Sequence, residues 1–201
     1  TFSHAIGHQN QYTAANITAA YGTLAINKRD VTLTSNSGTK PYDGTPLTDA
    51  TVTVTGSGFV DGEVSDIRAT GTITQTGTVT NSITFTANPS YAETNYSITK
   101  VENTLEITAN TAAITITSAD GSWMYDGGAH TKPEYTVTYN GTNIPAVNGS
   151  DGLRFRLPTN DTLTVSPTFT GIKDVSENTT ANNTFSHAIG HQNQYTAANI
   201  T

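Results

Sequence analysis

Apolar and polar residues alternate over short stretches along most of the chain, and this alternation predicts β-strands. In residues 51–55 the valines share one face and the threonines the other. In residues 78–86 the same alternation puts Val79, Ile83 and Phe85 on one face. It returns at Ile114/Ile116, Tyr135/Val137/Tyr139, Leu153/Phe155/Leu157 and Leu163/Val165. A helical turn is expected only in Ala14–Tyr21, because no other segment has a helical spacing of apolar residues.

Strands with one apolar face and one Thr-rich face predict sheets that pack in pairs and keep their outer faces in water. Six or seven short strands fall in about 85 residues, which is the size of an immunoglobulin-like sandwich. We therefore predict an all-β chain of tandem immunoglobulin-like β-sandwich modules. The alternative is a β-grasp-like module, which would need a helix.

The chain repeats itself. Residues 1–18 recur letter for letter as residues 184–201, so the period is 183 residues, and such identity is typical of a tandem array. A weaker likeness lies within the period, where 31–44 resembles 114–127 and both stretches end in Tyr-Asp-Gly. Asn95-Tyr96 followed by Thr104-Leu105-Glu106-Ile107 likewise resembles Gln11-Tyr12 followed by Thr23-Leu24-Ala25-Ile26.

These likenesses predict the domain boundaries. Residues 1–27 are expected to be the C-terminal part of a preceding module of the second type. Residues 28–109 are the first module, and residues 110–201 are the second module. The second module is expected to lack its final strand, because the matching sequence, 19–26, occurs only before the first module.

The two Tyr-Asp-Gly triplets are the strongest local motif and are predicted to be structural turns. Asp can accept a hydrogen bond from its own backbone, Gly accepts a positive φ, and Tyr can cover the core edge with its hydroxyl in water. The turn residues are Tyr42, Asp43, Gly44, Tyr125, Asp126 and Gly127.

The Thr-rich first strand, the Tyr-Asp-Gly turn and the terminal Tyr and Thr-Leu-x-Ile motifs resemble the YDG and MBG-type repeats of large bacterial surface proteins. More broadly, they resemble bacterial immunoglobulin-like stalk repeats. The resemblance implies an extracellular, cell-surface, adhesin-like protein and brings no catalytic residues with it.

Composition narrows the range of functions. The 41 threonines favour folded β structure over disorder. A net charge of −7 with only 12% charged residues argues against nucleic-acid binding, which needs clustered cations. No apolar run is long enough to cross a membrane. The absence of cysteine excludes disulfides and thiolate sites, and no spacing suggests an enzyme active site, so we expect no enzyme activity.

No metal or other cofactor is expected. His4 and His8 are repeated as His187 and His191. Their spacing would suit two ligands of one metal ion only if they lay on a helix, and the Ala-Ile-Gly between them indicates a loop. Acidic turns that could hold calcium lack the alternating carboxylates of an EF-hand loop and are predicted to be solvated. They contain Asp61, Glu63, Asp66, Asp120 and Asp151.

Three functions follow from these patterns. The leading hypothesis is a structural repeat of a stalk or fibre whose partners are neighbouring repeats of the same protein. The second is direct binding of a host glycan or mucin through Trp123, Tyr125 and Tyr139, because exposed aromatic rings stack on sugars. The third is head-to-tail self-association, in which the 19–27 strand completes a neighbouring molecule.

Overall fold

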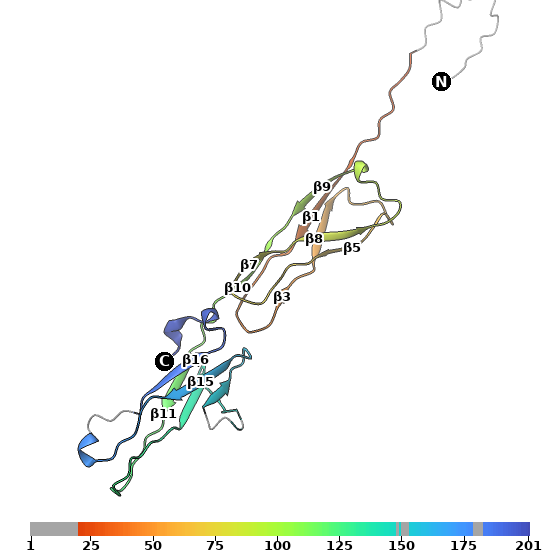
Figure 1. The fold of residues 1–201 in the computed structure, drawn as a ribbon. Coiled ribbons are helices and arrows are strands. Elements are labelled where there is room, and N and C mark those ends of the chain that lie inside the picture. The colour runs from red at the N-terminus through yellow and green to blue at the C-terminus, as the bar shows by residue number, and fades with distance from the viewer. Residues whose placement is uncertain (1–19, 148, 150–152, 179–182) are drawn as a thin grey trace, which may run out of the picture.

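The computed structural model describes residues 20–147, 149, 153–178 and 183–201 (Figure 1). These residues form strands and four 3-10 turns, with no α-helix, so the described chain is all-β. The helix that a β-grasp-like module would need is therefore missing from the described residues. The turns are η3 (Glu93–Asn95), η4 (Val175–Glu177), η5 (Gln192–Gln194) and η6 (Ala197–Asn199).

The strands of the first module form four small sheets. The three-stranded sheets have the orders β4-β1-β9 and β2-β10-β7, and the two-stranded sheets pair β3 with β6 and β5 with β8. The strands are β1 (Arg29–Ser35), β2 (Gly38–Pro41), β3 (Leu47–Thr48), β4 (Val52–Gly56), β5 (Val64–Ala69), β6 (Thr72–Ile73), β7 (Gly77–Thr80), β8 (Ile83–Ala87), β9 (Tyr96–Val101) and β10 (Thr104–Thr108). The late strands run parallel to the early ones, since β9 pairs with β1 and β10 with β2 in parallel ladders.

The second module has two three-stranded antiparallel sheets, β11-β12-β13 and β14-β15-β16. Their strands are β11 (Ile114–Ser118), β12 (Tyr135–Tyr139), β13 (Thr142–Ile144), β14 (Arg154–Arg156), β15 (Thr162–Pro167) and β16 (Phe185–Ile189). A parallel bridge joins Ile114 to Ile200. Among the described residues, each sheet takes all of its strands from one side of residues 109–113, and the two groups of sheets lie end to end (Figure 1).

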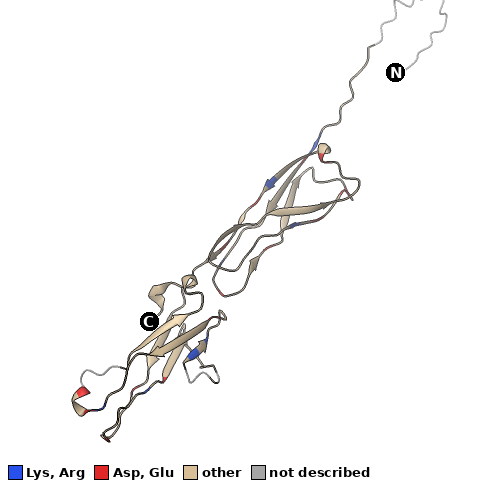
Figure 2. Cartoon of the chain, in the orientation of Figure 1, with Lys and Arg blue, Asp and Glu red and all other residues tan. Residues whose placement is uncertain are grey.

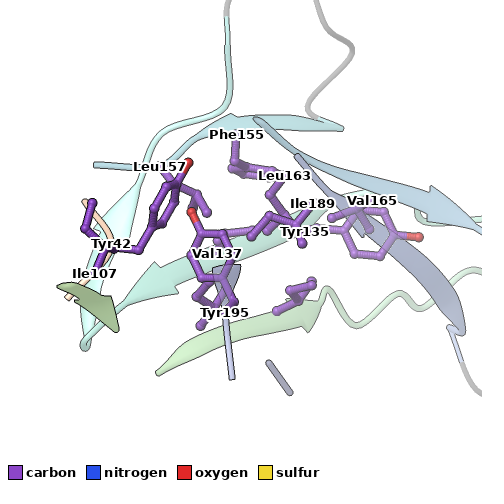
Figure 3. Packing of buried hydrophobic residues seen from close by; sticks show 12 residues of the cluster. Tyr42, Ile107, Tyr135, Val137, Phe155, Leu157, Leu163, Val165, Ile189 and Tyr195 are labelled. Atoms are coloured by element: carbon purple, nitrogen blue, oxygen red, sulfur yellow. The ribbon is translucent and has the colours of Figure 1, made fainter. Parts of the chain in front are cut away.

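Most of the buried apolar residues fall into two clusters. The smaller one joins Val31 and Leu33 of β1 to Ile83 of β8 and Tyr96 of β9, so the β4-β1-β9 sheet packs against the β5-β8 pair. The larger cluster is shown in Figure 3 and does not stop at the linker. It combines Tyr42 and Ile107 of the first module with the buried residues of the second, and Figure 3 shows Tyr42 and Ile107 together at one end, near Leu157.

The predicted alternation is confirmed in most strands. In 78–86, Ile83 is buried and the threonines are exposed, as expected. The run is nevertheless divided at Asn81, whose buried amide donates hydrogen bonds to Asn36 O (3.0 Å) and Asp49 O (2.9 Å). The two halves of the run therefore belong to different sheets, β7 with β10 and β8 with β5.

Val54 was expected on the core side but is 39% exposed, because β4 is an edge strand that pairs only with β1 in the described chain. The helical turn expected in Ala14–Tyr21 and most of the predicted partial module 1–27 lie outside the described residues. Residues 14–18 recur as 197–201, and there Ala197–Asn199 forms a 3-10 turn.

Candidate functional site

The first Tyr-Asp-Gly triplet forms the turn that follows β2. The Tyr42 amide donates to Thr108 O of β10 (2.9 Å), and Asp43 Oδ1 accepts from the Thr45 amide (2.9 Å). Gly44 has a φ of +79°, so the predicted turn geometry is confirmed. The hydrogen bond from Lys40 (2.8 Å), followed by those from Thr45, lowers the pKa of Asp43 to about 2.

Tyr42 is not at the surface, contrary to the expectation that its hydroxyl would lie in water. Only 4% of this residue is exposed, because it inserts into the end of the second module. Its ring meets the Tyr195 ring edge-on, at 5.8 Å between centroids, and lies 6.5 Å from the His191 ring. Burial, and then the nearby Asp161 carboxylate, raises the pKa of Tyr42. We call this contact, between residues 42–44 and the end of the second module, the joint.

A buried carboxylate stands at the centre of the joint. Asp161 accepts hydrogen bonds from the Tyr195 hydroxyl (2.5 Å) and Thr159 Oγ1 (3.2 Å), and its other oxygen lies 2.7 Å from His191 Nδ1. Burial alone would raise the pKa of Asp161, but the hydrogen bonds from His191, Tyr195, Thr159 and Tyr42 outweigh it and lower that pKa. Burial, and then the hydrogen bond to Asp161, raises the pKa of the Tyr195 hydroxyl. The joint therefore keeps a charged carboxylate beside neutral phenols.

Asn110 holds the linker against both modules. It is buried, and its Nδ2 donates to Tyr42 O (2.7 Å) and to the Tyr139 hydroxyl (2.8 Å). Its Oδ1 accepts from the Ala112 amide (2.8 Å), and its own amide donates to Gln194 O (2.8 Å). One side chain thus fastens the first turn, the linker and β12 together.

The backbones also approach each other closely in the joint. A Cβ added to Gly44 would lie 1.9 Å from Thr159 O. The Thr76 amide of the first module donates to the buried Gln194 Oε1 of the second module. Only a residue without a side chain fits at position 44, so the joint has one tightly defined packing arrangement.

The second Tyr-Asp-Gly triplet has the same turn but no such burial. Gly127 also has a φ of +79°, and Asp126 Oδ1 accepts from the Gly128 amide (2.8 Å). That bond, and then the one with His130 (2.9 Å), lowers the pKa of Asp126. Tyr125 is 65% exposed, and a Cβ on Gly127 would meet nothing within 4 Å. This turn lies at the end of the second module that faces away from the joint (Figure 1).

The structure brings together two of the three residues predicted to bind a glycan. Trp123 and Tyr125 line one cavity of about 280 Å³, where the Trp123 ring stacks on His130 at 5.1 Å between centroids. Tyr139 lies elsewhere, because its hydroxyl bonds to Asn110 in the joint.

A tyrosine–carboxylate pair also stands at the N-terminal end of the first module. The Tyr96 hydroxyl donates to Glu63 and accepts from the Val60 amide (3.0 Å). Tyr96 pairs with the start of β1 as Tyr195 pairs with Asn110. Burial, and then Glu63, raises the pKa of Tyr96. Each module thus has, at its N-terminal end, a buried tyrosine whose hydroxyl bonds to a carboxylate, and that carboxylate is buried in the second module and half-buried in the first.

Three of the candidate metal ligands are engaged in other contacts, and His4 and His8 lie outside the described residues. Glu63 bonds to Tyr96, Asp66 pairs with Arg68 and His191 bonds to Asp161, while Asp151 lies outside the described residues. No group of three such side chains in the described part of the chain is placed to hold a metal ion. Figure 2 shows acidic and basic residues scattered over both modules. No helix in the described ranges is long and apolar enough to span a membrane.

Sequence reasoning missed several residues of the joint, namely Asn110, Thr159, Asp161 and His191 as a partner of Asp161. A signal existed for one of them, since Asn27 and Asn110 both lie four residues before the matching positions Val31 and Ile114, at which the likeness between the two modules begins. Comparison of the chain with protein-family models, curated proteins and solved structures finds no match.

Proposed function

We propose that the chain is a structural repeat of an extracellular cell-surface stalk, fibre or adhesin, in which immunoglobulin-like β-sandwich modules hold a binding domain away from the cell. The burial of Tyr42 in the next module carries this proposal. The tandem repetition and the end-to-end placement of the two modules support it (Figure 1). A stalk needs contacts between its modules that resist bending, and the joint is such a contact.

The immunoglobulin-like assignment is supported by the strand arrangement. β1 lies between an antiparallel neighbour, β4, and a parallel late strand, β9. That sheet packs on the β5-β8 pair through Leu33 and Ile83. Two packed layers of short strands in about 85 residues fit a small sandwich better than any helix-containing alternative.

The joint is strong enough to matter mechanically. A buried tyrosine removes about 150–250 Å² from water, which is worth about 4–6 kcal/mol as an upper limit. The Asn110 and Asp161 hydrogen bonds add directional contacts, each worth about 1 kcal/mol or more. Bending the linker would expose Tyr42 and break these bonds, so the modules are expected to move as one rod.

Small-angle X-ray scattering of the whole chain tests the rod. We expect Tyr42→Ala to broaden the distribution of interatomic distances, because the modules then pivot on the linker. Tyr125→Ala is the matched control, since it changes the same motif where no module is docked, and it should leave the distribution unchanged. Identical scattering from Tyr42→Ala, with circular dichroism showing that both modules are folded, would contradict the rigid joint.

The location can be tested separately. An antibody raised against the chain should label unpermeabilised cells that produce the protein. Labelling that requires permeabilisation would contradict the extracellular location.

Direct glycan binding is the second candidate function, and it would depend on Trp123 and Tyr125 without Tyr139. A glycan array probed with the wild-type chain and with Trp123→Ala separates the two functions. A spacer gives no specific signal with either protein. A signal that is lost in Trp123→Ala, with folding unchanged, would favour the glycan function.

A further inference from the structure

The first two strands of the first module run side by side with its last two, in the same direction. β1 pairs with β9 in a parallel ladder that begins with Arg29 opposite Tyr96. β2, the next strand after β1, pairs with β10, the next strand after β9, in a parallel ladder that ends with Pro41 opposite Thr108. The start and the end of the module are therefore held together along its length.

Side chains join the two ladders where β1 ends. Ser35 is fully buried, and its Oγ accepts a hydrogen bond from the Asn103 amide (2.9 Å) while its carbonyl oxygen accepts one from Asn103 Nδ2 (2.6 Å). After β2, the Tyr42 amide donates to Thr108 O (2.9 Å). The pairing thus continues from β1 to the first Tyr-Asp-Gly turn.

The chain enters and leaves the first module at opposite ends. It enters at Arg29, the start of β1, and leaves at Thr108, the end of β10, beside the second module (Figure 1). Tension along the chain therefore pulls β1 and β2 one way and β9 and β10 the other way, parallel to the strands. Because the hydrogen bonds of a parallel ladder are evenly spaced, such a load acts on all of them together. A load across the strands would instead break the bonds one after another.

Tyr42 adds resistance at the far end of β2. It directly follows β2, and its side chain is buried in the second module with its ring edge-on to Tyr195 (Figure 3). Asn110, which follows β10 and is pulled the opposite way, donates to Tyr42 O (2.7 Å). For β2 to slide along β10, Tyr42 would have to leave the second module and this hydrogen bond would have to break.

We propose that the first module is a load-bearing unit, in which the β1–β9 and β2–β10 ladders resist tension in shear and Tyr42 anchors β2 in the second module. The second module thereby raises the force that the first module withstands. This inference deepens the proposed stalk function and rests on it, because a stalk that holds a binding domain is stretched when the bound target is pulled away. The quantity that matters under such a load is the rate of unfolding rather than the free energy of unfolding.

Single-molecule force spectroscopy of the whole chain in two pulling directions tests the inference. The chain has no cysteine, so pairs of introduced cysteines attach the handles at chosen positions. The pair Lys28→Cys/Thr111→Cys pulls along the strands. The pair Lys28→Cys/Glu93→Cys pulls the start of β1 away from the start of β9, across the strands. All three residues are exposed and lie outside the strands, so both variants should fold.

We expect the pair that pulls along the strands to rupture at a force several-fold higher than the pair that pulls across them. The rupture should be a single step that lengthens the chain between the handles to about 280–300 Å, which identifies it as unfolding of the whole first module. The pair that pulls across the strands should yield at low force, because it opens the β1–β9 ladder bond by bond.

Tyr42→Ala, added to both handle pairs, separates the anchor from a general loss of stability. The force along the strands should fall. The force across the strands should stay the same, because that direction opens the module at the end away from Tyr42 (Figure 1). Tyr125→Ala is the matched control, since it changes the same motif outside the stretch between the handles, and it should leave both forces unchanged.

Equal rupture forces in the two directions would overturn the inference. So would a force along the strands that Tyr42→Ala leaves unchanged, or lowers only together with the force across them. The load-bearing unit can fail these tests while antibody labelling and Tyr42→Ala scattering still support the stalk. Labelling can likewise fail while the forces are as expected, so the two failures are distinguishable.

Discussion

Gly44 of the first module lies directly against the backbone of Thr159 in the second, with room for no side chain between them. A Cβ on Gly44 would fall 1.9 Å from the Thr159 carbonyl oxygen. Gly127 occupies the same place in the second Tyr-Asp-Gly turn, has the same φ of +79°, and faces no neighbouring atom within 4 Å of such a Cβ. The chain thus contains one motif in a docked and an undocked form, which allows the effect of docking to be measured.

The pair Gly44→Ala and Gly127→Ala separates turn strain from docking. Both variants place an alanine at positive φ, which costs about 1–2 kcal/mol. Only Gly44→Ala also forces the modules apart, so we expect it to cost about 2 kcal/mol more. Urea unfolding followed by circular dichroism measures the difference.

Equal losses of stability in the two variants would show that the contact at Gly44 yields without cost, and that the joint is loose. Scattering adds a second reading. Gly44→Ala should alter the distances between modules, whereas Gly127→Ala should not.

Local patterning predicted much of the fold. The alternation of Ile114 and Ile116 with threonines places both isoleucines in the core, and the Tyr-Asp-Gly turns have the expected Asp and Gly conformations. These features depend on residues that are near one another in the chain. The alternation of side chains along a strand and the residue preferences of turns therefore predict them.

Features that depend on distant residues were not predictable. The break at Asn81 is stabilised by carbonyl groups at positions 36 and 49, which the alternation on either side of Asn81 does not encode. Asp161 and Glu63 accept hydrogen bonds from corresponding tyrosines, Tyr195 and Tyr96. They lie in loops that do not align in the two modules, so no shared spacing in the sequence predicts them. The burial of Tyr42 depends on a neighbouring module, which the turn sequence itself does not encode.

Acid should weaken the joint. The folded state lowers the pKa of Asp161, so its contribution to stability is complete above the unfolded pKa of about 3.9 and is lost as the pH falls through the lower, folded value. We expect the urea midpoint to fall on acidification below about pH 4. Asp161→Asn should be less stable at neutral pH and less sensitive to acid, and an unchanged pH profile in that variant would assign the acid effect to other carboxylates.

Asn110→Asp tests the linker clamp with almost no change in size. The carboxylate keeps an acceptor for the Ala112 amide and can accept from the Tyr139 hydroxyl, but it has no donor for Tyr42 O, which is left without a partner and faces a negative charge. We expect a loss of about 2–3 kcal/mol in the free energy of unfolding. Asn27→Asp is the control, because Asn27 is exposed, and it should change stability by less than about 0.5 kcal/mol.

Alkali should weaken the joint through Tyr195. Its folded pKa is raised by burial and by the hydrogen bond to Asp161, so the neutral phenol stabilises the folded state. That contribution is complete below the unfolded pKa of about 10 and is lost as the pH rises from there toward the folded value.

Tyr195→Phe should therefore cost about 1–3 kcal/mol at neutral pH, since Asp161 loses a donor, and should flatten the decline in urea midpoint above about pH 10. Tyr125→Phe, which alters an exposed ring, should change neither quantity. If Tyr195→Phe retained the full alkaline decline, the loss would have to arise from other buried phenols, of which Tyr42 and Tyr96 are the first to test.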